Sequence, residues 1–465
     1  MKLVTRFSPL VALSVFCLFL LGTSAIGFGQ SKPSKGLTAI RPGYVRMPNV
    51  NINSVRTPSS SIRLVLPKGA TGTRGLLVFD ANGSGNGSGP HNKAANNPGG
   101  EDNAGPAIPG LDTVPTFAGA FSSPFPSIDP FQSDGFTTVS PWVMIGNQPQ
   151  LGETTVIPAN LVAVSLQLLN PDGTVFANVP YGPFEDLTED SPNFRNANYS
   201  VGRTQFGDAV QRAEFFNSME EDWHTLLQPS FTNRVTIQVP ATVQVQFFDG
   251  TILTVPGYIP QTAADGSTVV FMLDLLFNNL DFNQAVNDIN GGSFSTKAMN
   301  YHLYPNTFLF SIVDEQGDLN CCVLGFHEYI FDPTVTPTPR WIYSFVSWIS
   351  PGIFGGGAQD VTALSHETSE ALNDPFGNNI VPTWQFPGQP GVCQANLETG
   401  DPVEVLPVST VPVTTREHHE VFTYHPQTEA LLQWFEIGNP SNAIGGAWSY
   451  PDTTALPSAA TPCPF

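Results

Sequence analysis

One short run in the C-terminal part of the chain, ALSHETSEALNDPFGNN at 363–379, concentrates side chains that bind metals or move protons. His366 and Glu370 are four residues apart, so in a helix they stand one above the other on the same face. Glu367 follows His366 directly and lies about 100° further around the helix axis. This HExxE pattern can place an imidazole and a carboxylate on one cation, with a second carboxylate beside it.

The chemistry that this spacing favours is zinc-assisted hydrolysis. The pattern differs in one ligand from the HExxH helix of zinc peptidases, and zinc accepts a carboxylate oxygen at a distance similar to that of an imidazole nitrogen. A third ligand is expected from the downstream stretch CQANLETGDPVEV at 393–405. We predict that His366, Glu370 and Glu398 bind the zinc ion. Glu367 is the predicted catalytic base, which takes a proton from metal-bound water.

Three further side chains are candidates for a supporting role. Asp401 lies three residues after Glu398 and could orient a ligand or replace it. His327 ends an apolar, strand-like run and is interpreted as a core histidine, a fourth ligand or an oxyanion donor. Asp374 follows the predicted helix on the His366 face, which makes it another alternative ligand.

The helix that must position these groups has recognisable ends. Asp360 is a candidate N-cap, and Pro375 disfavours helical backbone at the residue before it. Apolar and small residues recur at helical spacing on a face that we expect to pack on the core: Val361, Leu364, Thr368, Ala371 and Leu372. The catalytic groups stand on another face of the same helix.

These landmarks resemble those of the plant exordium family, also called phosphate-induced protein 1-like, and of uncharacterised exported bacterial proteins with a related helix. The resemblance covers about 320–405 and rests on four motifs: Gly325-Phe326-His327, His366-Glu367-Thr368-Ser369-Glu370, Asp374-Pro375 and Glu398-Thr399-Gly400-Asp401. Thr368-Ser369 departs from the small apolar residues usual in the relatives, without touching the proposed ligands. The resemblance implies an exported protein with a shared His, Glu and Asp site, and it implies no particular reaction.

The remaining pattern favours a β-rich α+β globular region at 111–465, with the candidate site at 320–405. Two hairpins are predicted around Asn-Pro-Asp-Gly in 168–179 and around Asp-Gly in 243–255. Helices are predicted at 206–227, which would carry His224, and at 272–289. The histidines of REHHEVFTYHP, namely His418, His419 and His425, are expected at the surface. Whether 111–465 forms one domain or two is left open.

The N-terminal part has a different composition. Lys2 and Arg6 precede an apolar run and then small residues, which together predict a signal peptide at 1–29. The region 30–110 is of low complexity and is expected to be poorly ordered, apart from strand-like pieces such as SIRLVL and RGLLVFD. We therefore expect a secreted, extracellular or periplasmic protein with no membrane span after signal cleavage.

Charge and cysteine content narrow the function further. The net charge is −21, and removal of 1–29 takes away two cations and no acid, so nucleic acid is not an expected partner. Export permits disulfides among Cys321, Cys322, Cys393 and Cys463. A bond between the adjacent pair would be strained, so each cysteine is expected to have a distant partner, or to stay a buried free thiol.

Three functions compete at this point. The favoured one is an exported, zincin-like metallohydrolase, with a peptidase as the preferred class and a peptide or other extracellular molecule as substrate. The second is a non-catalytic extracellular binding or structural protein, with or without a metal. The third is a carbohydrate-active enzyme in which Glu367 and Asp401 flank a groove. The first predicts that His366, Glu370 and Glu398 converge on one point.

Overall fold

The computed structural model describes residues 38–40, 45–46, 62–65, 114–123, 138–247, 252–312, 319–332, 339–354, 357–385, 393–404, 408–417, 419–437 and 440–463. The expected signal peptide at 1–29 and the strand-like piece RGLLVFD at 74–80 lie outside these residues, so both stay predictions. Among the helices in the described stretches, none combines the length and the apolar character that a membrane crossing requires.

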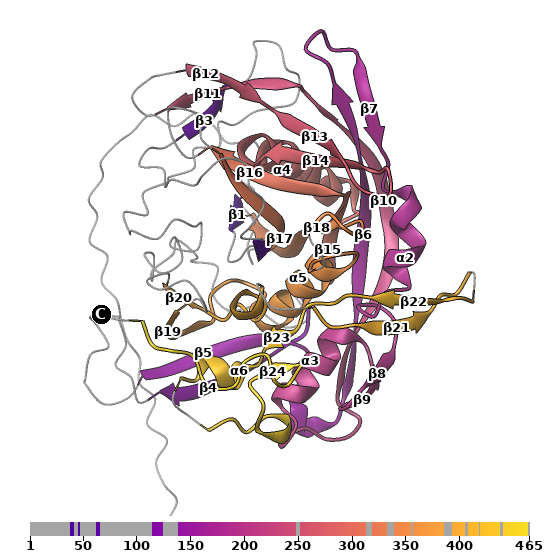
Figure 1. The fold of residues 1–465 in the computed structure, drawn as a ribbon. Helices are drawn as coiled ribbons and strands as arrows, with labels where there is room; N and C mark the ends of the chain where they lie inside the picture. The colour runs from indigo at the N-terminus through magenta and orange to yellow at the C-terminus, as the bar shows by residue number, and fades with distance from the viewer. Residues whose placement is uncertain are drawn as a thin grey trace, which may run out of the picture.

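A mixed sheet of eleven strands forms the centre of the described structure (Figure 1). Eight strands follow one another across it in the order β10 (His224–Val239), β6 (Thr154–Leu169), β15 (Met299–Pro305), β18 (Arg340–Trp348), β17 (Leu319–Phe331), β16 (Thr307–Ile312), β14 (Thr268–Leu273) and β13 (Tyr258–Thr262). Beside this path, β7 (Val175–Val179) pairs with β6, and β1 (Thr38–Ile40) and β2 (Val45–Arg46) pair with β17. Strands β10, β6, β15 and β18 are mutually parallel, whereas β17 is antiparallel to β18 and β16. This strand-rich arrangement confirms the expected β-rich α+β class.

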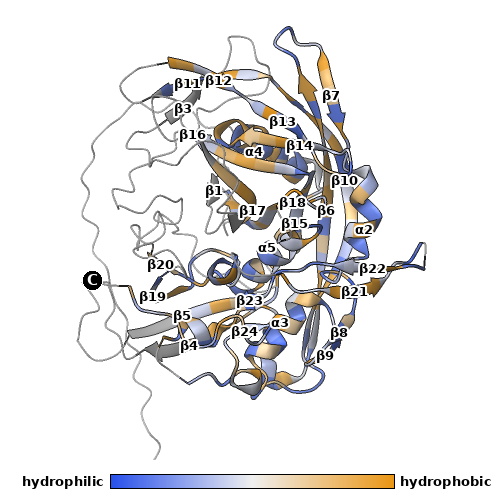
Figure 2. Ribbon diagram, in the orientation of Figure 1, coloured by the Kyte–Doolittle hydropathy of each residue, from blue (hydrophilic) through white to orange (hydrophobic). Residues whose placement is uncertain are grey.

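Two helices cover opposite faces of this sheet. Successive side chains of a strand point to opposite faces. In β15, Leu303 belongs to the apolar cluster of helix α5 (Thr362–Asn373), whereas Tyr304 belongs to that of helix α4 (Asp274–Gly291). All seven residues of β15 are buried, as expected for a strand covered on both sides. Figure 2 shows the apolar strands of the sheet and the hydrophilic residues that α5 carries within the molecule.

Shorter elements surround this core. The remaining helices are α2 (Glu185–Glu189), α3 (Phe206–Glu214), α6 (Leu432–Phe435) and the single turns η1 (Pro149–Leu151), η2 (Gly182–Phe184), η3 (Asp401–Val403) and η4 (Ile444–Gly446). Small antiparallel sheets are formed by β12 (Ile252–Pro256), β11 (Thr242–Phe247) and β3 (Ile62–Val65); by β4 (Thr116–Ser123) and β5 (Thr138–Ile145); by β8 (Ala197–Tyr199) and β9 (Gly202–Thr204); by β19 (Ile380–Gln385) and β20 (Cys393–Asn396); by β21 (Val411–Thr414) and β22 (Val421–Tyr424); and by β23 (Glu429–Ala430) and β24 (Ser449–Tyr450). Both predicted hairpins are confirmed, as β6–β7 and β11–β12.

The predicted helix at 206–227 is wrong beyond Glu214. The chain turns back after α3, and His224 begins strand β10 instead of lying on a helix face. The Arg212 guanidinium donates hydrogen bonds to the main-chain carbonyls of Glu221 and Trp223, and Trp223 is fully buried. Burial of this large aromatic side chain outweighs the helical periodicity of the local sequence.

The cysteine pairing also differs from the expectation in part. Cys393 has the expected distant partner, Cys463, at a Cα–Cα separation of 6.0 Å. Cys321 and Cys322, however, are joined to each other. The C-terminal segment pairs with β19 through Trp384 and thereby brings Cys463 to Cys393. With Cys463 paired to Cys393, the described part of the chain offers Cys321 and Cys322 only each other as partners.

Candidate metal centre

Helix α5 is held inside the molecule by packing on several sides. It contacts β17 and β18 of the sheet, and also β5 and α3. A Cβ atom on Gly207 of α3 would lie 2.5 Å from Leu372 Cδ1, so the glycine allows α3 to approach α5 closely. The helix ends at Asn373 before Pro375, as predicted. All twelve residues of α5 are buried, so its charged residues are not solvated.

The start of α5 differs from the prediction. The N-cap is Val361, without a side-chain capping bond, and Asp360 has a positive φ of 44° that takes it out of the capping conformation. Its carboxylate instead accepts the N–H of His425 at 2.8 Å and pairs with the His425 ring at 2.6 Å. His425 is therefore half-buried, contrary to the expected surface position. His419 is exposed as expected, and His418 lies outside the described residues.

Strand β17 brings its Gly-x-His sequence to the α5 face of the sheet. Gly325 and His327 are two residues apart, so they point to the same face. A Cβ on Gly325 would lie 2.9 Å from both Cγ and Oε1 of Glu367, which is too close for a side chain. His327, one pleat further along, is fully buried beside the same helix. The glycine thus makes room for one carboxylate of the site, and the histidine contributes a ring nitrogen.

The turn after β20 closes the site from the other side. Glu398 precedes Gly400, whose N–H donates to Glu370 Oε1 at 3.1 Å. A Cβ on Gly400 would lie 2.2 Å from His366 Nδ1, so the backbone can approach the ring only at a glycine. Asp401 begins η3, and its Oδ2 accepts a hydrogen bond from Gln394 at 2.7 Å.

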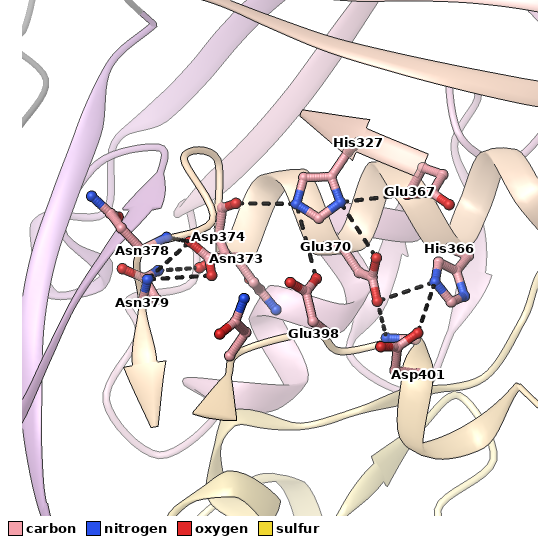
Figure 3. A network of polar contacts seen from close by, with 12 residues as sticks. His327, His366, Glu367, Glu370, Asn373, Asp374, Asn378, Asn379, Glu398 and Asp401 are labelled. Atoms are coloured by element: carbon pink, nitrogen blue, oxygen red, sulfur yellow. Dashed lines mark hydrogen bonds and ion pairs between the residues drawn. The ribbon is translucent and has the colours of Figure 1, made fainter. Parts of the chain in front are cut away.

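These elements bring most of the predicted residues together (Figure 3). Glu370 lies between the two histidines: its Oε1 is 3.1 Å from His366 Nε2, and its Oε2 is 3.4 Å from His327 Nδ1. His327 Nδ1 is also 3.4 Å from Glu367 Oε2, and its Nε2 is 4.0 Å from Glu398 Oε2. His366 Nε2 is 3.8 Å from Asp401 Oδ1. All of these side chains are fully buried.

Two sets of side chains have ligand atoms close enough together to hold a metal ion, and they share Glu370. One set is His327, Glu370 and Glu398, and the other is His366, Glu367 and Glu370. The expected trio of His366, Glu370 and Glu398 is therefore divided between the two sets. The reason is His327, which the longer-range pairing of β17 places next to Glu398. A metal ion is compatible with either set, and the geometry alone does not specify which metal.

Gln427 determines the tautomer of His366. The Gln427 side-chain N–H donates to the carbonyl of Gly400 at 2.6 Å, so Gln427 Oε1 faces His366 Nδ1, at 3.1 Å. Because this oxygen can only accept, Nδ1 carries a proton. Nε2 is left facing Glu370 and has no well-directed hydrogen bond within the described stretches of the chain. In a neutral ring, this arrangement presents a lone pair to a cation, which is the usual way of orienting a metal-bound histidine.

A backbone carbonyl orients the ring of His327 in a similar way. The ring Nε2 is 3.2 Å from the carbonyl oxygen of Asp374, which accepts its proton and leaves Nδ1 toward Glu367 and Glu370. The Asp374 carboxylate itself points elsewhere, because it accepts the N–H groups of Asn378 at 3.0 Å and Asn379 at 3.1 Å. Asp374 therefore contributes its main-chain carbonyl to the site, where it orients the His327 ring. Its carboxylate, which was predicted as an alternative ligand, points away from the site.

The carboxylates of the site lack sufficient positive partners. Among the described residues, Glu367, Glu370 and Glu398 form ion pairs only with the two histidines. Neither oxygen of Glu398 accepts a hydrogen bond from the part of the chain that the structure describes, although the residue is fully buried. An unpaired buried carboxylate is costly, and proteins relieve this cost by protonation, by pairing or by metal binding.

The pKa values reflect this shortage in the metal-free protein. Burial raises the pKa of Glu398 well above its usual value, and the charge of Glu370 adds to the effect. Burial also raises the pKa of Glu367, to about 7, against the opposing hydrogen bond from His327. For Glu370 burial acts in the same direction, but the charges of His366 and His327 outweigh it and lower the pKa. A pKa near neutrality suits a general base.

Two residues of the site carry no signal in the sequence. Gln427 and Glu429 come from the loop before β23 and from β23 itself, in a stretch, PQTEALL, without a catalytic motif. The Ala430 N–H bonds to the Thr399 carbonyl at 2.7 Å, which fixes this segment beside the turn that contains Glu398. Glu429 is fully buried, and burial raises its pKa well above the usual value.

Comparisons of the chain with protein-family models, with curated proteins and with solved structures find no match. The resemblance of 320–405 to the exordium family therefore stays a prediction.

Proposed function

We propose that the protein is an exported zinc-dependent hydrolase, with a peptidase as the preferred class. The observation that supports the proposal is the convergence of His327, Glu370 and Glu398 within ligand distance of one another, with the Glu367 carboxylate beside them. The convergence brings together strand β17, helix α5 and the turn after β20, so it does not follow from local sequence alone.

Zinc fits the donor set better than calcium or magnesium. Imidazole nitrogen is a common ligand of zinc and other transition metals, whereas calcium and magnesium prefer oxygen ligands throughout. The two histidines are oriented for ligation by Gln427 and by the carbonyl of Asp374. Partners of this kind tune metal affinity in known sites.

In this proposal each residue has a defined task. Glu370, Glu398 and His327 would hold the cation, and zinc would supply a bound water of lowered pKa. Glu367 would accept a proton there, because its carboxylate lies beside this set, 3.4 Å from the His327 ring, and its Oε1 has no hydrogen bond from the described residues. Gly325 and Gly400 keep the surrounding backbone close enough to exclude other groups.

The burial of the site favours one alternative, a non-catalytic extracellular protein with a structural metal. Structural zinc sites are closed by four protein ligands, whereas catalytic sites keep an exchangeable position. Every side chain of the two sets is fully buried, which is the condition of a closed site. The same burial disfavours the carbohydrate-active alternative, because Glu367 and Asp401 would have to line an open groove.

Cobalt substitution distinguishes the two metal-binding alternatives. We would replace zinc by Co²⁺ and record the visible spectrum before and after addition of acetohydroxamate, a small chelating inhibitor. A spectral change means an open coordination position and supports the hydrolase. An unchanged spectrum means a closed site and overturns the hydrolase in favour of the structural metal.

The catalytic base is tested with Glu367→Gln, beside Glu220→Gln as a charge-matched control at the surface. With casein as substrate, Glu367→Gln should keep the zinc ion bound by His327, Glu370 and Glu398 and lose cleavage by 100-fold or more, on the order of a general-base contribution. Retention of full cleavage by Glu367→Gln would contradict the assigned role.

A further inference from the structure

We propose that the site holds a second divalent cation, so that Glu370 bridges two metal ions. This inference rests on the proposed function and extends it: the first cation lies with His327 and Glu398, and the second with His366 and Glu367. Two metal ions bridged by a carboxylate are a recurrent arrangement in hydrolases.

The bridging geometry comes from Glu370 itself. Its two carboxylate oxygens face different histidines, Oε1 toward His366 Nε2 and Oε2 toward His327 Nδ1. A carboxylate that served one ion would not need to present its second oxygen to another imidazole nitrogen. The ligand sets on the two sides share no other residue.

The second set has an independent indication of a ligand. His366 Nε2 is fully buried and lies near the carboxylates of Glu370 and Asp401, but among the described residues it has no well-directed hydrogen bond. Gln427 fixes a ring proton on the opposite nitrogen. A lone pair 3.1 Å from the Glu370 carboxylate would be repelled. Either a proton or a metal ion must therefore lie between the two atoms. The Glu398 oxygens provide the same indication for the first set.

Charge balance favours a second cation. At least five fully buried carboxyl groups lie around the two histidines: Glu367, Glu370, Glu398, Asp401 and Glu429. With neutral imidazoles, one divalent cation would offset two of their negative charges, and two divalent cations would offset four. Gly400 donates its N–H to the same oxygen of Glu370 that faces His366, which holds that oxygen in place.

The test counts zinc ions by native mass spectrometry in wild type, His366→Ala, Glu398→Gln and Glu370→Gln, with Glu220→Gln as control. We expect two ions per chain in wild type and in the control, one in His366→Ala, one in Glu398→Gln, and loss of both in Glu370→Gln. Magnetic coupling in the electron paramagnetic resonance spectrum of the cobalt protein should accompany the second equivalent. Circular dichroism identifies variants that fail to fold, and His366→Gln is then the replacement for His366→Ala.

The outcomes separate this inference from the proposed function. One zinc ion in wild type, retained in His366→Ala, would overturn the second cation and assign His366 as a protonated counter-ion, while the hydrolase proposal would stand. No zinc in folded wild type would overturn both.

Discussion

The two faces of the central sheet each bury a cluster of histidine and carboxylates, and the clusters differ in how their charges are satisfied. On the α4 face, His302 of β15 lies between Asp281 at 2.8 Å and Asp288 at 3.0 Å. Asp281 also accepts hydrogen bonds from Tyr304 and Tyr343. On the α5 face, Glu398 receives no hydrogen bond from any residue that the structure describes.

The difference lies in the supply of donors. Asp288 accepts from Asn233 at 2.7 Å and from Gln284 at 2.8 Å, so each carboxylate oxygen of the α4-face cluster has a partner from the chain. This cluster is complete without any added group and is expected to be structural. The same residue types on the α5 face have fewer donors among the described residues, and their arrangement is compatible with a metal ion. Histidine and carboxylate together do not indicate a metal site unless the donors are missing.

The largest change in unfolding free energy is expected from a substitution in the α4-face cluster. Asp281→Asn leaves the buried His302 with one carboxylate and should lower the free energy of unfolding by about 3–5 kcal/mol, the usual cost of removing one partner from a buried ion pair. Urea denaturation would measure the change, and metal content should stay as in wild type. A loss of metal in this variant, with the fold intact, would contradict the division into two independent clusters.

The pH dependence of stability should show whether His302, in the α4-face cluster, is protonated in the folded protein. Burial opposes protonation of His302, but Asp281 and Asp288 raise its pKa from 6.5 to about 9. Because the folded-state pKa is raised, the stabilisation is full below pH 6.5 and is lost as the pH rises through about 9. The difference in unfolding free energy between wild type and His302→Gln should therefore fall by on the order of 3 kcal/mol across that window. A flat difference would mean that His302 is neutral in the folded protein.

Zinc should stabilise the protein through the α5 face alone. With free zinc at about 100 times its dissociation constant, the free energy of unfolding should rise by about 2.7 kcal/mol in wild type. Thermal unfolding with zinc and with a chelator would show the shift. The shift should persist in His302→Gln and vanish in Glu370→Gln, and the opposite result would exchange the roles of the two clusters.

The smallest expected change in unfolding free energy has a sign that depends on whether zinc is bound. In metal-free protein, burial raises the pKa of Glu398, so folding at neutral pH requires protonation of this carboxyl group. Glu398→Gln removes that cost and should raise the free energy of unfolding by about 1–2 kcal/mol. With zinc present the same variant should be less stable than wild type, because it loses a ligand. If Glu398→Gln were less stable than wild type both with and without zinc, Glu398 would already have favourable partners in the metal-free protein.

Local sequence could predict α5 and its contents, because His366, Glu367 and Glu370 are fixed relative to one another by helical spacing. Glu398 was also accessible, as a carboxylate beside a glycine turn. His327 was a predicted alternative ligand, but its place beside Glu398 depends on the pairing of β17. Gln427 was missed, because its position depends on where the segment before β23 returns. The α4-face cluster was missed for the same reason: Asp281 and Asp288 meet His302 only after α4 packs on the sheet.

The anomalous scattering of zinc tests the central claim most directly. Crystals of the zinc-treated protein, measured on both sides of the zinc absorption edge, would locate the metal without assuming its ligands. The account predicts an anomalous peak between His327, Glu370 and Glu398, and a second peak between His366, Glu367 and Glu370. The absence of any peak at these residues in well-ordered, zinc-treated crystals would contradict it and leave the α5 face as a second structural network.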